Sequence, residues 1–289
     1  MKTGKHLIDA NKYMEDAKTE LSKANWWFNR IDKYKAIELM KKAGITFALI
    51  PDYLKSANAY FQILQLIINS PELYIDLTIH KIALLYLEMC NKAKIHIDNS
   101  IIDLINNKII PYLQETKSYR TVNNLLEEIS INCDIFGNTD ESIKYYQKIL
   151  GNSELHNDIS TKLKILNKMA ELNISSNKNT IASDNYMNCA KIALLIPSLK
   201  IVVRYYLLYS LILVLDEISE EQMNEKIIEY TDMYPMFSNS PEYNLINGLT
   251  IAYKVKNVEY IKQVIINNLK NFDTHIIKVL EELKNKVMN

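Results

Sequence analysis

Residues 32–67 read DKYKAIELMKKAGITFALIPDYLKSANAYFQILQLI, and apolar side chains recur in this stretch largely at intervals of three and four residues. This spacing places the apolar side chains on one side of an α-helix and leaves the charged side chains on the other side. Pro51 interrupts the first run and starts a second one, because proline is tolerated in the first turn of a helix but not in its interior. The stretch therefore predicts two amphipathic helices joined by a short connection.

Similar amphipathic runs follow along the rest of the chain. Several begin at or just after a cap-like residue, such as Ser70, Asn138, Ser219 or Ser240. Helices of about 12 to 20 residues with connections of about 2 to 8 residues form antiparallel hairpins, and two helices per unit give a repeat of roughly 40 residues. The expected helix starts lie near Pro71, Ile97, Pro111, Thr139, Asp158, Thr180, Pro197, Ser219, Pro241, Val258 and Asp273.

A recurring phrase supports this repeat. Residues 32–36, DKYKA, are echoed at residues 52–56 and at residues 140–146. We predict an all-α fold, a tetratricopeptide-like right-handed solenoid of antiparallel helical hairpins over residues 1–217, continuous with a C-terminal helical bundle over residues 218–289. A compact helical bundle is the alternative.

The composition excludes several classes of function. With 34 basic and 34 acidic side chains, the net charge of zero argues against nucleic-acid binding over the whole surface. Only five glycines occur, and none belongs to a phosphate-binding loop, a dinucleotide fingerprint or a nucleophile elbow. The five histidines and three cysteines show no zinc-binding spacing. We therefore predict no catalytic residue, no metal site, no cofactor and no nucleic-acid partner.

The same reasoning predicts a cytoplasmic location. Three cysteines far apart in the sequence indicate reduced thiols, and the N-terminus lacks the apolar core of a signal peptide. The longest apolar stretch, residues 201–215, contains Arg204 and is shorter than the roughly 20 residues that span a membrane. We expect a soluble protein whose membrane contact, if any, is peripheral.

One cluster of aromatic residues stands out. Trp26, Trp27 and Phe28 are contiguous and include both tryptophans of the chain, within residues 25–30, where the first helix is expected to end. Three adjacent side chains cannot all face inward, because neighbours on a helix point about 100° apart. Exposed aromatics beside a basic residue such as Arg30 have the character of an interfacial membrane anchor. The alternative is an aromatic plug that covers the end of the solenoid.

A second cluster is basic. Lys162, Lys164 and Lys168 alternate with apolar residues, and Lys164 and Lys168 share a helix face because they are four residues apart. On a solenoid this face could meet an acidic partner. The alternative is a set of lysines that only solubilise the surface.

Two stretches resemble the soluble NSF attachment proteins, the SNAP family of SNARE adaptors. Residues 53–66, YLKSANAYFQILQL, are similar to the second helix of that family, with residues 32–36 in the same register. Residues 234–242, YPMFSNSPE, are similar to the family's aromatic-Pro-x-Phe-x-x-Ser-x-Glu turn. The resemblance spans nearly the whole chain, is strongest over residues 11–67 and 228–287, and favours the alpha type over the gamma type.

The resemblance implies a function. Such an adaptor is not an enzyme: it binds the SNARE four-helix bundle and presents it to the NSF-type hexameric AAA ATPase, which disassembles the bundle during vesicle trafficking and membrane fusion. Lys164 and Lys168 match two family lysines that face the SNARE bundle. The resemblance also places Trp26, Trp27 and Phe28 at the family's membrane-attachment loop, which implies a peripheral membrane protein.

Several positions depart from the family pattern. The other SNARE-facing lysine aligns with Leu126 or Glu127, so Lys117 or Arg120 would have to compensate for it. The arginine of the family's Ser-Arg-Glu turn is replaced by Pro241. Residues 254–256 are Lys-Val-Lys, at the place where the family has an acidic cluster that docks on the ATPase. Residues 286–289 lack the family's acidic ending. Two alternatives therefore remain, a SNAP relative that does not activate the ATPase and a tetratricopeptide-like scaffold for another ligand.

Overall fold

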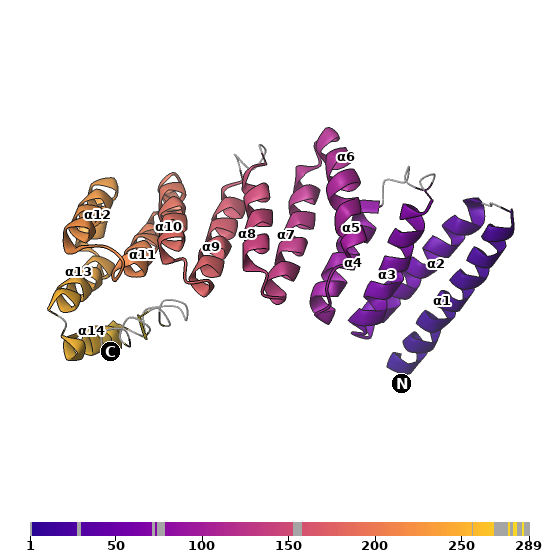
Figure 1. The fold of residues 1–289 in the computed structure, drawn as a ribbon, viewed down its shortest axis with the longest axis horizontal. Helices are drawn as coiled ribbons and strands as arrows, with labels where there is room; N and C mark the ends of the chain where they lie inside the picture. Colours follow the sequence, from indigo (N-terminus) through magenta and orange to yellow (C-terminus); the bar gives the residue numbers. More distant parts are fainter. Residues whose placement is uncertain are drawn as a thin grey trace. The chain divides into compact units, whose positions relative to one another are not determined.

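The computed structural model describes residues 2–27, 30–70, 73, 79–152, 158–255, 257–268, 277, 280–281 and 285. All regular elements within these residues are helices, and no strand occurs among them (Figure 1). The prediction of an all-α fold is therefore confirmed. The chain divides into two compact units, Met1–Glu154 and Leu155–Asn289.

The first unit consists of helices that follow one another along the chain. Its elements are α1 (Lys2–Trp27), α2 (Arg30–Leu49), α3 (Tyr53–Ile68), α4 (Ile79–Ala93), α5 (Asn99–Leu104), the π-helical turn η2 (Ile105–Ile109), α6 (Ile110–Glu115), α7 (Tyr119–Ile135) and α8 (Thr139–Leu150). Consecutive helices pack together as antiparallel neighbours: α1 with α2, α2 with α3, α3 with α4, and α7 with α8 (Figure 1). α4 also packs directly on α7. These are the helical hairpins that the sequence predicts.

The second unit has one continuous core. Its elements are α9 (Ile159–Ser175), α10 (Asn179–Leu194), the 3-10 turn η4 (Pro197–Leu199), α11 (Lys200–Val214), α12 (Glu220–Met233), the 3-10 turn η5 (Pro235–Asn239), α13 (Pro241–Lys254) and α14 (Val258–Asn268). α11 packs on α10, α12 and α13, and its Val203, Leu207 and Leu211 are fully buried. The predicted division between residues 217 and 218 falls within this core, and it stays a prediction.

α11 also belongs to a stretch with the composition of a membrane helix. Among the described residues, only Pro197–Val214 has the length and the apolar composition that a membrane-spanning helix needs. Leu207, Leu208 and Leu211 of this stretch are buried in the core of the second unit. Because core helices of soluble proteins pass the same test, the stretch gives only weak support for a membrane span.

Buried serines join the helices of three hairpins. Ser56 Oγ on α3 donates to the carbonyl oxygen of Gly44 on α2 at 2.8 Å, and Ser130 Oγ on α7 donates to the carbonyl oxygen of Ser142 on α8 at 2.8 Å. Ser183 on α10 makes the same type of bond to α11. Each hydroxyl satisfies its own hydrogen-bonding capacity while its small side chain lets two helix backbones approach closely. Ser56 and Ser142, which belong to the recurring phrases at residues 52–56 and 140–146, therefore lie where paired helices pack.

Four turns between helices have the same backbone conformation. Lys94, Lys117, Gly137 and Asn177 have positive φ angles of 53°, 55°, 74° and 55°, and each lies one or two residues after the end of a helix. In each turn the next residue donates its N–H to a carbonyl oxygen five residues back, as in the bond from Lys178. This is the Schellman motif, which usually places glycine at the positive φ. Here lysine or asparagine occupies three of the four positions, which explains how so few glycines suffice.

An α-helix, α6, begins at Ile110 beside Pro111, as the sequence predicts, although the helical backbone leads into it without a break. Residues 99–115 are continuously helical, and the π-helical turn η2 precedes the proline. In this turn the N–H of Ile110 donates to the carbonyl oxygen of Ile105, five residues back instead of four. The wider turn accommodates Pro111, which has no N–H to donate and whose ring would clash with a regular α-helix.

Candidate functional site

The predicted lysine pair lies on the outer face of α9. Asp158 caps this helix, because its carboxylate accepts a hydrogen bond from the backbone N–H of Thr161 at 3.0 Å. The inner face is buried and includes Leu166 and Met169. Lys164 is therefore left exposed and Lys168 half-buried, one helical turn further along. The structure thus confirms that the two lysines share a face, while their role stays a prediction.

Lys168 has an acidic neighbour on its own helix. Its Nζ lies 2.8 Å from Oε2 of Glu171, and the two side chains are 45% and 30% exposed. Glu171 is not among the site residues predicted from the sequence. Its position three residues after Lys168 is the signal that could have indicated this contact.

Lys117 and Arg120, which are predicted to compensate for the missing family lysine, do not lie on α9. Lys117 occupies the positive-φ position of the turn between α6 and α7, and Arg120 is in the first turn of α7. Both are exposed. They belong to the first compact unit, whereas Lys164 and Lys168 belong to the second. Their contribution to one common surface stays a prediction.

Leu126 and Glu127, the two residues that the resemblance matches to the other SNARE-facing lysine, are not basic. Leu126 is buried at 3% exposure, so it cannot present a group to a partner, and Glu127 is half-buried. Burial raises the pKa of the neighbouring Glu128 above its ordinary value, and the hydrogen bond from Asn91 partly offsets this increase. The carboxylates of Glu88 and Glu127 raise the pKa of Glu128 further.

The same region contains a polar network that the sequence did not indicate. Asn91 donates to Oε2 of Glu128 at 2.7 Å, and Asn132 donates to Oδ1 of Asn91 at 2.8 Å. Asn132 also accepts a hydrogen bond from the backbone N–H of Ile97 at 3.2 Å. These bonds join α4, the segment after it and α7. We assign this network a structural role, because it satisfies buried polar groups.

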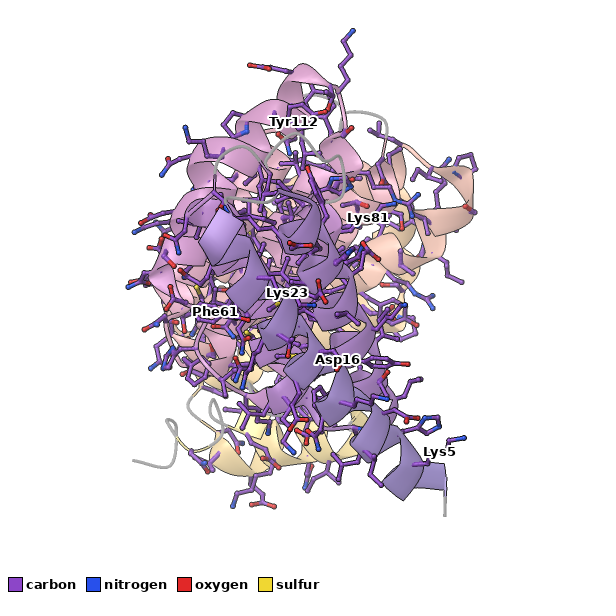
Figure 2. All side chains as sticks on the ribbon, turned by 90° about the vertical axis from the view of Figure 1, so that its right-hand side faces the viewer. Lys5, Asp16, Lys23, Phe61, Lys81 and Tyr112 are labelled. Atoms are coloured by element: carbon purple, nitrogen blue, oxygen red, sulfur yellow. The ribbon has the colours of Figure 1, made fainter. Side chains whose placement is uncertain are left out.

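The aromatic cluster lies largely outside the described side chains. α1 continues through Trp26 and Trp27, and α2 begins at Arg30, so the expected connection over residues 25–30 is shorter than predicted. Phe28 lies outside the described residues. Figure 2 shows α1 from outside, with exposed charged residues along it such as Lys23, whose Nζ lies 2.8 Å from Oε1 of Glu20. The membrane role of the three aromatics stays a prediction.

The turn at residues 234–242 forms a well-packed connection to α13. Phe237 is fully buried and packs edge-on against Tyr243, and Ser240 caps α13 by accepting the N–H of Tyr243 at 3.1 Å. Glu242 is only 5% exposed, and its Oε1 lies 3.3 Å from Nε of Arg204 on α11. This ion pair joins residues far apart in the sequence, which is why sequence spacing does not indicate it.

The end of α13 contains residues that the resemblance matches to the family's ATPase-docking cluster. Lys254 ends α13, and its Nζ lies 2.9 Å from Oε1 of Glu220 on α12. Val255 is 59% exposed, and Lys256 lies outside the described residues.

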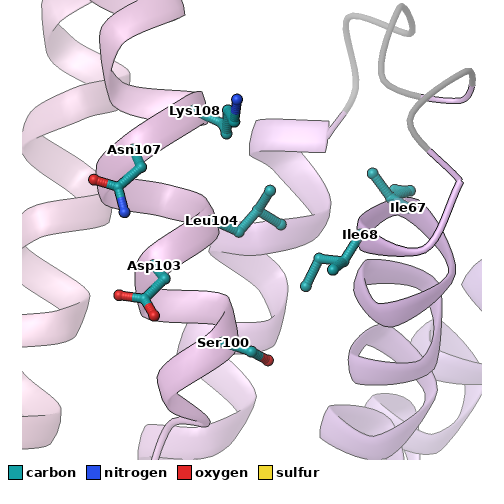
Figure 3. A pocket seen from close by; sticks show the side chains of 7 residues that line it. All are labelled: Ile67, Ile68, Ser100, Asp103, Leu104, Asn107 and Lys108. Atoms are coloured by element: carbon teal, nitrogen blue, oxygen red, sulfur yellow. The ribbon is translucent and has the colours of Figure 1, made fainter.

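The described residues include a cavity in the first unit and two buried cysteines, Cys90 and Cys189. A cavity of about 610 Å³ lies between α3 and the α5–η2 segment (Figure 3). It is lined by Ile67, Ile68, Ser100, Asp103, Leu104, Asn107 and Lys108. Burial raises the pKa of Cys90 to about 11 and that of Cys189 to about 12, so both thiols stay protonated at neutral pH. Within the described part of the chain, no three His, Cys, Asp or Glu side chains are placed to hold a metal ion.

Comparison with known proteins matches these features to one family. No curated protein sequence matches the chain. The family model described as "Soluble NSF attachment protein, SNAP" matches residues 8–288. The match covers the hairpins of the first unit, the lysine face of α9 and the turn before α13. The chain therefore belongs to the soluble NSF attachment protein family.

Proposed function

We propose that this protein is an adaptor that binds assembled SNARE complexes and recruits the NSF-type ATPase for their disassembly in membrane traffic. Membership of the family supports a general role in NSF attachment. One observation supports the more specific proposal: Lys164 and Lys168 lie on one outer face of α9. The resemblance matches these two residues to family lysines that face the SNARE bundle.

The chemistry of this face suits a largely acidic coiled coil. Two cationic side chains one helical turn apart attract carboxylates before contact and so speed the encounter. Exposed ion pairs each contribute little, about 0–1 kcal/mol, and salt screens them. Binding should therefore depend on several such contacts at once and weaken as the salt concentration rises.

A pull-down tests this proposal directly. The full-length protein should retain an assembled SNARE four-helix bundle and should retain the individual SNARE helices much more weakly. The reason is that only the bundle presents acidic side chains from several helices at fixed spacing. If no tested bundle binds, the SNARE proposal is wrong, and a scaffold for another helical ligand becomes the better interpretation of this fold.

We further propose that Trp26, Trp27 and Phe28 attach the protein peripherally to membranes from the cytoplasmic side. Replacing all three by serine should abolish most of the association with liposomes, because aromatic side chains provide the apolar area that enters the lipid interface. Co-flotation with liposomes measures this, and circular dichroism checks that the helix content is unchanged. A wild-type protein that does not float with liposomes would rule out the anchor.

A second candidate function is that of a family member that binds SNARE bundles without activating the ATPase. The ion pair between Lys254 and Glu220 favours it, because the family pattern has an acidic cluster at this edge. Pro241, in the first turn of α13, replaces an arginine of the family pattern. Measuring ATP-dependent disassembly of a bound bundle separates the two candidates: release of the SNARE helices supports recruitment, and a stable complex supports the second candidate.

A further inference from the structure

The outer face of α9 carries a third charged group in line with the two lysines. Lys164, Lys168 and Glu171 are spaced by four and then three residues, which places them on one stripe of the helix. At about 1.5 Å of rise per residue, the lysines are separated by roughly 6 Å along the helix axis and Glu171 follows after about 4.5 Å. From Lys164 to Glu171, the charges along this stripe are therefore positive, positive and negative.

The acidic group is close enough to change what the stripe attracts. Oε2 of Glu171 lies 2.8 Å from Nζ of Lys168, and both side chains are partly exposed. A carboxylate of a partner that approaches Lys168 therefore also approaches the carboxylate of Glu171. A basic side chain of the partner would instead gain an attractive contact with Glu171.

We infer that Glu171 makes this stripe selective for a helical bundle that presents two acidic side chains followed by a basic one. This inference rests on the proposed function, because it concerns the same face of α9. A uniformly acidic bundle would place a carboxylate opposite Glu171, and this repulsion discriminates against it. A bundle with a lysine or arginine at that point would satisfy all three groups of the stripe.

The test compares Glu171→Gln with a matched control. Glutamine removes the charge of Glu171 and keeps its size and its ability to accept a hydrogen bond. Glu141→Gln is the control: its Oε2 lies 2.8 Å from Nζ of Lys144, also three residues away, but on α8. Both substitutions change the net charge equally, and both break one exposed ion pair between residues three apart.

Binding is measured against an assembled SNARE bundle and against variants of that bundle in which each exposed lysine or arginine is replaced by glutamine in turn. We expect one bundle position whose replacement weakens binding of the wild type about threefold but leaves binding of Glu171→Gln unchanged, in keeping with the size of an exposed charge pair. Glu141→Gln should behave as the wild type at every position. Raising the salt concentration should reduce the difference.

Two results would overturn the inference and are distinguishable. If the wild type binds the bundle and no basic bundle position couples to Glu171, the selectivity is wrong while the adaptor role stands. If the wild type binds no bundle, the proposed function fails and the inference fails with it.

Discussion

Replacing both Lys164 and Lys168 by glutamate is expected to lower the affinity for an assembled SNARE bundle at least about tenfold at physiological salt, since like charges facing each other across an interface cost several kcal/mol and each 1.4 kcal/mol is a factor of ten. The two side chains lie one turn apart on α9, so one acidic patch of the partner can meet both. Titration of the labelled bundle at several salt concentrations measures the effect. The wild type should lose affinity as salt rises, and the double variant should be less sensitive to salt.

α8 offers a matched control for this double variant. Lys144 and Lys148 are also four residues apart and both exposed, so replacing them by glutamate makes the same change in net charge at the same spacing. We expect this control to retain nearly the wild-type affinity. Equal losses in the two double variants would show a non-specific attraction between charged molecules, and an unchanged affinity in the α9 variant would remove this face from the binding site.

Helix boundaries were predictable where a local signal sets them. Ser219 forms a reciprocal capping box with Gln222, and Ser240 caps α13, as their positions in the sequence suggest. α6 begins beside Pro111 as expected, but the sequence pattern does not indicate that helical backbone leads into it through a π-helical turn. The π-helical turn before Pro111 is stabilised by burial of Ile105 and Ile109, which sequence spacing does not reveal.

In the candidate site, too, the sequence predicts features that depend on neighbouring residues but not contacts between residues far apart in the chain. The spacing of Lys164 and Lys168 is enough to place them on one helix face. The pair of Arg204 and Glu242 depends on how α11 packs on α13, so no local pattern predicts it. The network of Asn91 and Asn132 likewise forms only when α4 and α7 meet. Contacts within one helix can therefore be predicted from the sequence, and contacts between helices require the structure.

Replacing Gly44 by alanine is expected to destabilise the protein by about 2 kcal/mol, within the range for overpacking a close contact. For a chain of this length, that loss corresponds to roughly 3 °C in the midpoint of thermal unfolding. A Cβ atom at Gly44 would lie 2.7 Å from Cζ of Tyr60. The ring has no room to move away because Tyr60 is 1% exposed. α2 and α3 would have to separate, which also strains the hydrogen bond from Ser56 to the Gly44 carbonyl.

At Gly248, in contrast, we do not expect the same added methyl group to destabilise the protein. It lies within α13, and its nearest neighbour would be Val264 Cγ2 at 3.9 Å, an ordinary van der Waals contact. Gly248→Ala should therefore be neutral or stabilising by up to about 1 kcal/mol, because alanine favours a helix interior over glycine. Thermal unfolding followed by circular dichroism compares the two variants.

A double variant separates the contact with Tyr60 from other effects at Gly44. Tyr60→Leu shortens the side chain that the new methyl group would meet, so Gly44→Ala should cost less in the Tyr60→Leu background than in the wild type. The difference between the two costs is the energy of this one contact. If Gly44→Ala is as stable as the wild type, then α2 and α3 do not pack this closely, and the small residues of the sequence repeat need another explanation.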